Sequence, residues 1–313
     1  MKKPEVTIVI PLYNRAHLIE RTLESVSDQS YRPIRLIVVD NNSSDSSSDV
    51  VARWASRHET VDFRVTLLHE SRQGAAIARN TGLAACDTEW VFFFDSDDRM
   101  LPSLVESVMT ETRRDPELDI VFWQTAFVMP DGRIKRRPFS LSRPMHRHLY
   151  NCLLSTQAFA VKSAFIRSCG GWNERLKVWD DWELGFRLLT ASPRMKGIDR
   201  ILVHIYPQEE SLTGLDYNSK SGKWEEAIGE MEHHARSSAD SRRDIWLRML
   251  LYRRINLAAL YSAEGRKDLG EALKEETMQS EGGRKLSRGR RLLLNLIYEY
   301  TRRGGRAAYL LWD

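Results

Sequence analysis

Three carboxylates follow a buried-strand pattern between residues 90 and 98. The stretch reads Trp-Val-Phe-Phe-Phe-Asp-Ser-Asp-Asp, so Asp95, Asp97 and Asp98 come directly after an aromatic run. A continuous apolar run is typical of a strand that is buried on both faces of a parallel sheet. Three like charges at its end must be solvated, paired or bound to a cation. We therefore expect a divalent metal here, with an acidic turn before the helix after Pro102 as the alternative.

These acids belong to a chain that alternates strand and helix patterns over its first hundred residues. The predicted strands are 6–10, 34–39, 65–68 and 90–94, and helical spacing is found over 18–26, around 50–54 and over 74–85. This alternation predicts an α/β fold with a doubly wound parallel sheet. Right-handed crossovers would bring the strand ends with residues 11–14, Asp40 and residues 95–98 to one edge, where such sheets bind ligands.

The composition excludes several classes of protein. The 313 residues are 42% hydrophobic and 29% charged, and a net charge of +4 is too small to indicate nucleic-acid binding. Three separated cysteines form no Cys-x-x-Cys pair, which argues against a disulfide framework and suits the cytoplasm. No Gly-x-Gly-x-x-Gly or Walker lysine motif follows the first strand. Without a signal-peptide core or an apolar run of about 20 residues, we expect a soluble protein or one attached to a membrane surface.

Four stretches occur in the order and spacing of a known family. They are Val6-Thr-Ile-Val-Ile-Pro-Leu-Tyr-Asn14, Ile37-Val-Val-Asp-Asn-Asn-Ser-Ser-Asp45, Gly74-Ala-Ala-Ile-Ala-Arg-Asn-Thr-Gly-Leu83 and Phe94-Asp-Ser-Asp-Asp98. Together they resemble the nucleotide-binding half of family 2 glycosyltransferases. The resemblance implies a GT-A fold, which is Rossmann-like with a mostly parallel sheet and flanking helices. It also implies an enzyme that transfers a sugar from a nucleotide-diphosphate sugar.

The resemblance assigns the ends of the first two strands to the nucleotide. In the family, the acid that matches Asp40 accepts a hydrogen bond from the N3–H of uracil. Pro11, Tyr13 and Asn14 would line the cleft, and Tyr13 could pack against the base or the ribose. Local alternatives are that Asp40 only caps the turn after it and that Asn14 only caps the first helix.

The diphosphate of such a donor needs positive charge beside it. Mg²⁺ and Mn²⁺ take oxygen ligands and are commonly held by one or two carboxylates plus substrate phosphates. Asp95 and Asp97 would point the same way in an extended chain. The resemblance places Asp95 near the ribose and makes Asp97 the preferred metal ligand, with Asp95 and Asp98 as further candidates. Arg79 and Asn80 could reach ribose or phosphate, although Arg79 could also be a solvated helix residue.

Asp180 and Asp181 lie at the start of a predicted buried helix, whose dipole alone would favour acids there. The resemblance makes Asp181 the general base, with Asp180 in the place of a glutamate. Asp181 would deprotonate an acceptor hydroxyl for a single inverting attack on the anomeric carbon, while the metal stabilises the departing nucleoside diphosphate. Trp172, Trp179 and Trp182 would surround this site, either as core or as a platform for the acceptor sugar.

One segment departs from the family pattern. Many relatives carry an arginine and then a histidine before a Ser-Leu-Ser/Thr sequence, and these places hold Tyr206 and Gln208 here. His204 lies in a predicted strand and is expected to be structural, whereas Ser211 is a candidate neighbour of the diphosphate. The basic residues between 130 and 150 predict either an irregular solvated loop or a lid over the donor.

We expect a transferase domain over residues 1–215, divided near residue 100 into a nucleotide-sugar half and an acceptor half. The rest, 216–313, should be helical, with helices over 224–236, 244–262, 268–278 and 292–300. Residues 284–306 hold eight Lys or Arg and one acid, Glu299, around an apolar run. This segment could lie on an anionic membrane surface at the inner face of the membrane, or pack on the protein with its arginines in solvent.

The leading expectation is an inverting, metal-dependent transferase, as in polysaccharide synthesis. Its donor would be a UDP-sugar, and it would use a glycan or lipid-linked acceptor. A nucleotidyltransferase also uses strand-end acids, but no Gly-rich phosphate loop is present. A nucleotide- or carbohydrate-binding protein with a degenerate site is the rival without catalysis. The joint presence of Asp40, Asp95, Asp97 and Asp181 argues against that rival.

Overall fold

The computed structural model describes residues 3–137, 139–208, 217–306 and 312. The chain divides into two compact units, one of residues 1–147 and 152–208 and the other of residues 148–151 and 209–313. Apart from Ser211, which lies outside the described residues, all the residues predicted to bind substrate or metal belong to the first unit.

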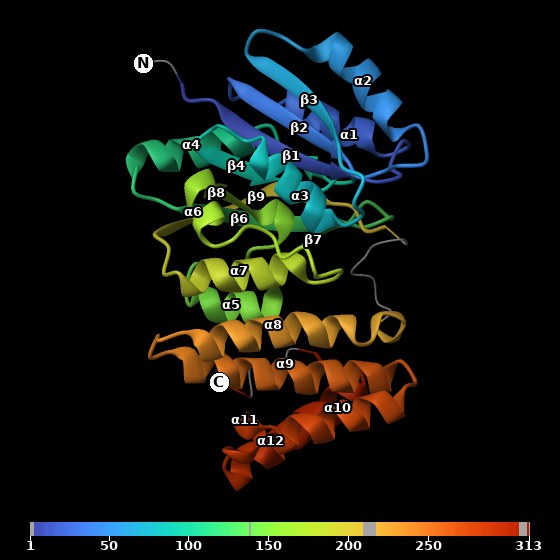
Figure 1. Ribbon diagram of the computed structural model, residues 1–313, viewed down its shortest axis with the longest axis vertical. Helices are drawn as coiled ribbons and strands as arrows, with labels where there is room; N and C mark the ends of the chain where they lie inside the picture. The colour runs from blue at the N-terminus through green and yellow to red at the C-terminus, as the bar shows by residue number, and fades with distance from the viewer. Residues whose placement is uncertain (1–2, 138, 209–216, 307–311, 313) are drawn as a thin grey trace. The chain divides into compact units, whose positions relative to one another are not determined.

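The first unit is built on one mixed sheet (Figure 1). Its strands are β1 (Val6–Leu12), β2 (Ile34–Asp40), β3 (Phe63–His69), β4 (Trp90–Phe93), β5 (Arg99–Met100), β6 (Ile120–Val128), β7 (Ile134–Arg136), β8 (Phe159–Lys162) and β9 (Met195–Ile205). Their order is β3-β2-β1-β4-β8-β6-β9-β5, and β7 pairs with β6. The strands β1 to β4 are mutually parallel, whereas β8 runs antiparallel to both β4 and β6. The predicted α/β class is confirmed, and the parallel sheet predicted for the first hundred residues is that of β1 to β4.

Helices cover both faces of this sheet, which explains why its central strands are apolar throughout. The helices up to residue 190 are α1 (Ile19–Ser27), α2 (Ser47–His58), α3 (Ala75–Ala84), α4 (Leu104–Arg114), α5 (Pro144–Asn151), η1 (Thr156–Ala158), α6 (Ser163–Ser168) and α7 (Asp180–Thr190). Ile8 and Ile10 of β1 share one core with α1, α2 and α4. Val9 points to the other face, into a core that includes α3, α6 and α7. Alternate residues of one strand therefore serve two cores.

Two local expectations were wrong. The first strand was expected to end at residue 10, before Pro11, but β1 continues through Pro11, which pairs in register with Val39. The partner strand β4 ends opposite Val9, so the N–H that Pro11 lacks is not needed for that ladder. The basic stretch over 130–150 is also not irregular, because it contains β7 and α5.

The second unit is helical, as predicted. Its helices are η2 (Asn218–Lys220), α8 (Lys223–Ser237), α9 (Arg243–Ala263), α10 (Lys267–Gln279), α11 (Glu281–Arg284) and α12 (Arg288–Arg302). The helix α9 packs against α8, α10 and α12 and contributes buried residues such as Leu250 and Ile255. Over the described part of the chain, each helix is too short or too polar to cross a bilayer.

Candidate active site

The carboxyl ends of β1, β2 and β3 meet at one edge of the sheet. Register pairs Leu12 with Asp40 and Asp40 with His69. Asp40 is buried, accepts a hydrogen bond from the Ser43 N–H at 3.2 Å, and lies 3.3 Å from Nδ1 of His69. Burial raises the pKa of Asp40, but the bonds from Ser43, Ser48 and His69 outweigh it, so the pKa lies below its ordinary value. Asp40 is an anionic acceptor, and His69 is a neighbour that the sequence did not reveal.

Asn14 ties the loops after β1 and β2 together. Its backbone N–H donates to Ser43 Oγ at 3.1 Å, and its Oδ1 accepts from the Ser44 N–H at 2.8 Å. Its φ of +50° is a left-handed conformation that asparagine tolerates. The helix α1 begins well after it, so Asn14 does not cap that helix. Pro11 is half-buried and Tyr13 is 46% exposed, which leaves the Tyr13 ring open to a ligand.

Asp98, the last of the three acids after β4, is hydrogen-bonded within the protein. Asp98 is 2% exposed, and its two oxygens accept hydrogen bonds from the Tyr206 N–H at 2.9 Å and from Gln157 Nε2 at 3.0 Å. Burial, and then the charges of Asp95 and Asp97, raise the pKa of Asp98 well above its ordinary value. These contacts give Asp98 a structural role in joining β4 to the segment after β9.

Asp95 and Asp97 are more accessible, with 30% and 23% of their side chains exposed. Burial, and then the charge of Asp95, raise the pKa of Asp97 to about 6, against the influence of Arg15 and Arg21. Arg15 Nε lies 3.9 Å from Asp97 Oδ2, and the Arg21 guanidinium donates to the Asp97 carbonyl. Neither arginine stood out in the sequence, because nothing there separates it from other basic residues near a helix.

The oxygens of Asp95 and Asp97 suit a hard divalent cation. Within the described ranges, no three His, Cys, Asp or Glu side chains gather into a metal cluster. Two carboxylates are nevertheless sufficient where substrate phosphates supply the other ligands, which is the usual arrangement for Mg²⁺ in phosphate-binding enzymes. A cation would also offset the repulsion that raises the pKa of Asp97.

Arg79 joins the strand-end acids to α7. Its side chain is buried, and it donates from Nη1 to Asp180 Oδ2 at 2.6 Å and from Nη2 to Asp95 Oδ1 at 2.9 Å. The guanidinium also lies 4.5 Å from the centre of the Trp172 ring. Burial opposes its charge, yet Asp180 and Asp95 outweigh burial and raise the pKa of Arg79. Arg79 is therefore not a solvated helix residue, and it brings two predicted groups of acids into one site.

Asn80 and the tryptophans are held by the protein itself. Asn80 Nδ2 donates to the Trp172 carbonyl at 2.9 Å and to Glu174 at 3.0 Å, and its Oδ1 accepts from the Trp172 N–H at 2.9 Å. Trp172 is 2% exposed. Trp179 and Trp182 are also buried, with ring centroids 5.0 Å apart. This burial favours the core interpretation over a sugar platform for all three rings.

Asp180 and Asp181 open α7 directly after Trp179, whose φ of +54° is unusual for a bulky residue. Asp181 Oδ2 accepts a hydrogen bond from the Thr156 N–H at 3.3 Å and a longer one from the Cys152 thiol at 3.7 Å. Burial, and then the charge of Asp180, raise the pKa of Asp181 to about 6. A carboxylate with such a pKa can take up a proton near neutral pH.

The segment that departs from the family pattern has structural contacts. His204 lies in β9, as predicted, where it pairs with Arg99 of β5. The Arg21 guanidinium lies 3.9 Å from the centre of the Tyr206 ring, and Gln208 Nε2 donates to the Tyr206 carbonyl at 3.1 Å. Ser211 lies outside the described residues.

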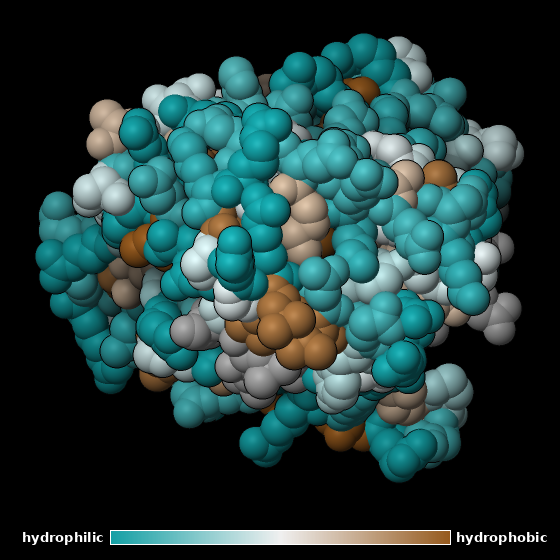
Figure 2. Space-filling model, turned by 90° about the horizontal axis from the view of Figure 1, so that it is seen from below, coloured by the Kyte–Doolittle hydropathy of each residue, from teal (hydrophilic) through white to brown (hydrophobic). Residues whose placement is uncertain are grey.

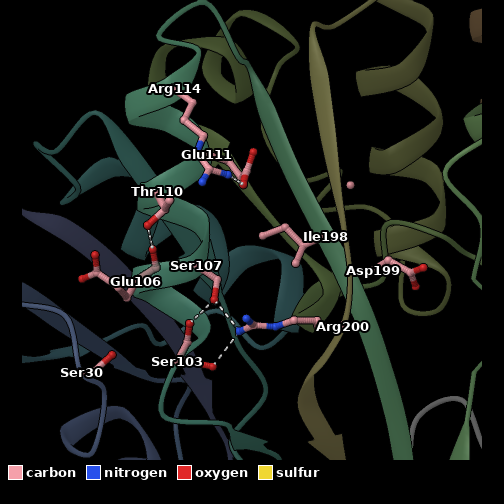
Figure 3. Close-up of a pocket in the computed structure, with 11 residues that line it drawn as sticks. Ser30, Ser103, Glu106, Ser107, Thr110, Glu111, Arg114, Ile198, Asp199 and Arg200 are labelled. Atoms are coloured by element: carbon pink, nitrogen blue, oxygen red, sulfur yellow. Dashed lines mark hydrogen bonds and ion pairs between the residues drawn. The ribbon is translucent and has the colours of Figure 1, made fainter.

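A separate groove of about 570 Å³ lies between α4 and the first part of β9 (Figure 3). The close-up shows Arg200 pointing toward α4, where it donates to Ser103 Oγ at 3.1 Å and to Ser107 Oγ at 2.9 Å. Its described lining includes none of the predicted site residues. The groove is therefore not the candidate active site, which is an open sheet edge.

Comparisons with known proteins agree on the family. The model of glycosyl transferase family 2 matches residues 7–172, which is more than half of the chain. The uncharacterized glycosyltransferase EpsJ of Bacillus subtilis is 25% identical over 226 residues, or 68% of this chain and 64% of the relative. The chain spans less than two thirds of the length of EpsJ, and only 32% and 36% of the lengths of two other curated relatives.

Solved structures agree on the fold. TarS of S. aureus, residues 1–349 in complex with UDP-GlcNAc, aligns with a TM-score of 0.73 at 17% identity and covers 97% of this chain and 93% of that one. The mannosyltransferase PcManGT of Pyrobaculum calidifontis, in complex with GDP-Man and Mn²⁺, aligns with a TM-score of 0.56 at 17% identity and covers 96% and 87%. These likenesses confirm the GT-A fold. The family model, which matches more than half of the chain, shows that the chain belongs to glycosyl transferase family 2.

Proposed function

We propose that this enzyme is an inverting, metal-dependent glycosyltransferase with a UDP-sugar donor and a hydroxyl acceptor on a glycan or a lipid-linked sugar. The Arg79 bridge carries the proposal, because one buried cation contacts a strand-end acid, Asp95, and an acid of α7, Asp180. Donor-side and acceptor-side carboxylates thereby belong to one site. The solved complexes of TarS with UDP-GlcNAc and of PcManGT with GDP-Man support a nucleotide-sugar donor.

The donor would bind along the edge formed by β1, β2 and β4. The anionic, buried Asp40 would accept the N3–H of uracil, and the exposed Tyr13 would pack against the base or ribose. Pro11 and Asn14 would shape this end of the cleft, and Asn14 does so by holding the β2 loop. Asn80 would act indirectly, by fixing the 172–174 backbone.

Asp95 and Asp97 would hold Mn²⁺ or Mg²⁺, which supplies positive charge to the leaving diphosphate when it is bound. The PcManGT complex, which contains Mn²⁺, supports this assignment. Asp98 is left out of the ligand set, since both of its oxygens already accept hydrogen bonds.

Asp181 would act as the general base. The acceptor oxygen attacks the anomeric carbon, the bond from that carbon to the diphosphate oxygen breaks, and the hydroxyl proton passes to Asp181. A single displacement of this kind inverts the anomeric configuration. A base with a pKa of about 6 is ionised at neutral pH and still accepts a proton as the attack proceeds. Asp180 would position the base through its ion pair with Arg79.

Thermal unfolding tests the donor assignment. UDP with Mn²⁺ should raise the melting temperature, and UDP alone or Mn²⁺ alone should raise it less. GDP with Mn²⁺ is the matched control for recognition of the nucleobase. Asp40→Asn should remove the preference for UDP over GDP. A larger shift with GDP would contradict the uracil assignment, and no shift with any nucleoside diphosphate would contradict the donor site itself.

A further inference from the structure

The helix α12 carries a row of apolar side chains on its outward face. Leu292, Leu296 and Tyr300 are 62%, 55% and 50% exposed. Their spacing of four residues puts them on one side of the helix, over a length of about 12 Å. Figure 2, which views the molecule from below, shows a hydrophobic patch among mostly hydrophilic side chains. A surface helix normally exposes polar residues on that side.

The opposite face of the same helix is already used inside the second unit. Leu294, Ile297 and Tyr298 are buried, and the Tyr298 hydroxyl lies 2.7 Å from Ser262 Oγ of α9. Among the described residues, the helix α12 therefore has two apolar faces, one packed inside the unit and one exposed. The outward row, defined as Leu292, Leu296 and Tyr300, is not explained by the stability of this unit.

Basic residues flank the outward row in the sequence, before Leu292 and after Tyr300. Residues 284–306 contain eight Lys or Arg and one acid, Glu299. That acid is paired with Arg302 at 2.6 Å and with Arg303 at 3.2 Å, so its charge is compensated. Arg288, one turn before Leu292, is exposed. By contrast, the neighbouring helix α10 has the sequence Lys-Asp-Leu-Gly-Glu-Ala-Leu-Lys-Glu-Glu-Thr-Met-Gln, with an excess of acids.

We propose that the outward row and its basic rim bind an anionic lipid surface. Apolar side chains on a helix that lies in the interface enter the region between headgroups and acyl chains, while arginines at the same level attract anionic headgroups. The charge around the row decides for lipid over a second copy of this chain, because two copies of this face would bring like charges together. The inference does not depend on the proposed donor or acceptor, although it suits a lipid-linked one.

Vesicle flotation with the full chain tests the proposal. The protein should float with phosphatidylcholine vesicles that contain about 30% phosphatidylglycerol, and much less with phosphatidylcholine alone. The double variant Leu292→Ser, Leu296→Ser should lower the partition coefficient by about tenfold or more. Val61→Ser removes an exposed apolar side chain elsewhere and should leave it unchanged. Likewise, Arg284→Glu with Arg288→Glu should abolish the lipid preference, whereas Arg53→Glu should not.

Two results would overturn the inference. One is equal flotation of the wild type and both double variants. The other is a concentration-dependent dimer that the Leu292 and Leu296 variant loses, with no flotation of the wild type, because the row would then be a contact between copies. The circular dichroism spectrum and the ligand-free thermal unfolding transition of each variant, compared with those of the wild type, show that it is folded. Because no nucleotide is used, failure of this test is distinguishable from failure of the donor proposal.

Discussion

The two groups of acids in this site are built in the same way from different elements. After β4, Asp98 is fixed by Tyr206 and Gln157, whereas Asp97 is left with a pKa raised to about 6. At the start of α7, Asp180 is fixed by Arg79, whereas the pKa of Asp181 is likewise raised to about 6. In each group, therefore, the protein binds at least one acid, which is Asp180 in α7 and both Asp95 and Asp98 after β4, and one further acid has a raised pKa.

The difference between the groups lies in what could relieve the raised pKa. Asp97 has Asp95 as a neighbour that shares its open side, so a divalent cation would serve both. Asp181 has the Thr156 N–H and the Cys152 thiol as partners, and Asp180 beside it is neutralised by Arg79. A second cation has no comparable pair of carboxylates there. We therefore propose charge neutralisation for the first group and proton transfer for the second.

Replacing the proposed base should have the largest effect. Asp181→Asn removes the proton acceptor without changing the shape of the side chain, so kcat should fall by about 10²- to 10⁴-fold. The shift of melting temperature by UDP and Mn²⁺ should be unchanged, because Asp181 contacts neither in the proposed site. Single-turnover transfer and thermal unfolding measure the two effects.

The comparison also predicts what Asp180→Asn does. The ion pair with Arg79 weakens, and the buried guanidinium loses one of its two carboxylates, so the loss of activity should come with a loss of stability of about 3 kcal/mol. If Asp180→Asn lost only activity and Asp181→Asn lost only stability, the two roles would have to be exchanged.

Asp97→Asn and Asp98→Ala should likewise separate a loss of ligand binding from a loss of stability. Both effects should be smaller than those of the Asp181 and Asp180 variants. Asp97→Asn removes a charged ligand and should weaken the Mn²⁺-dependent binding of UDP by at least about tenfold. Asp98→Ala leaves the Tyr206 N–H and the Gln157 amide without their acceptor, which should cost about 2 kcal/mol of stability. Calorimetric titration of UDP with and without Mn²⁺ measures the affinity, and urea unfolding measures the stability. Metal dependence lost on Asp98→Ala alone would contradict the ligand assignment.

The sequence was most informative where the signal is local. Apolar runs with helical patterns between them predicted β1 to β4 and their parallel order, because each run is long enough to fill two cores. The strands β5 and β7 were missed, since they have two and three residues and β7 is exposed. The strand β5 depends on its pairing with β9, which lies about 100 residues further along the chain, whereas β7 pairs with β6 across the short hairpin of residues 129–133.

In the candidate site, too, the sequence predicted local features but not contacts between distant residues. The acids could be predicted from their place after an apolar strand and before an apolar helix. Their partners could not, because the contact of Arg79 with Asp180 joins residues that are 101 positions apart. The burial of Trp172 and the hydrogen bonds of Asp98 also depend on the packing of distant segments. His69 becomes a site neighbour only through its register with Asp40.

The pH dependence of stability should show the smallest effect, and it has an unambiguous sign. Asp97 has a pKa of about 6 in the folded protein, above the value of about 3.9 for an unfolded chain, so the folded state binds the proton more tightly. The contribution of Asp97 to stability is then fully present below about pH 4 and is lost as the pH rises through about 6. Without metal, Asp97→Asn should match the wild type near pH 4 and exceed it near pH 7 by about 2 kcal/mol, as measured by urea unfolding. Saturating Mn²⁺ and UDP should reverse the order at pH 7, because only the wild type keeps the charged ligand. If Asp97→Asn were less stable than the wild type at pH 7 without metal, the carboxylate would be stabilised by the protein alone and would not be poised for a cation.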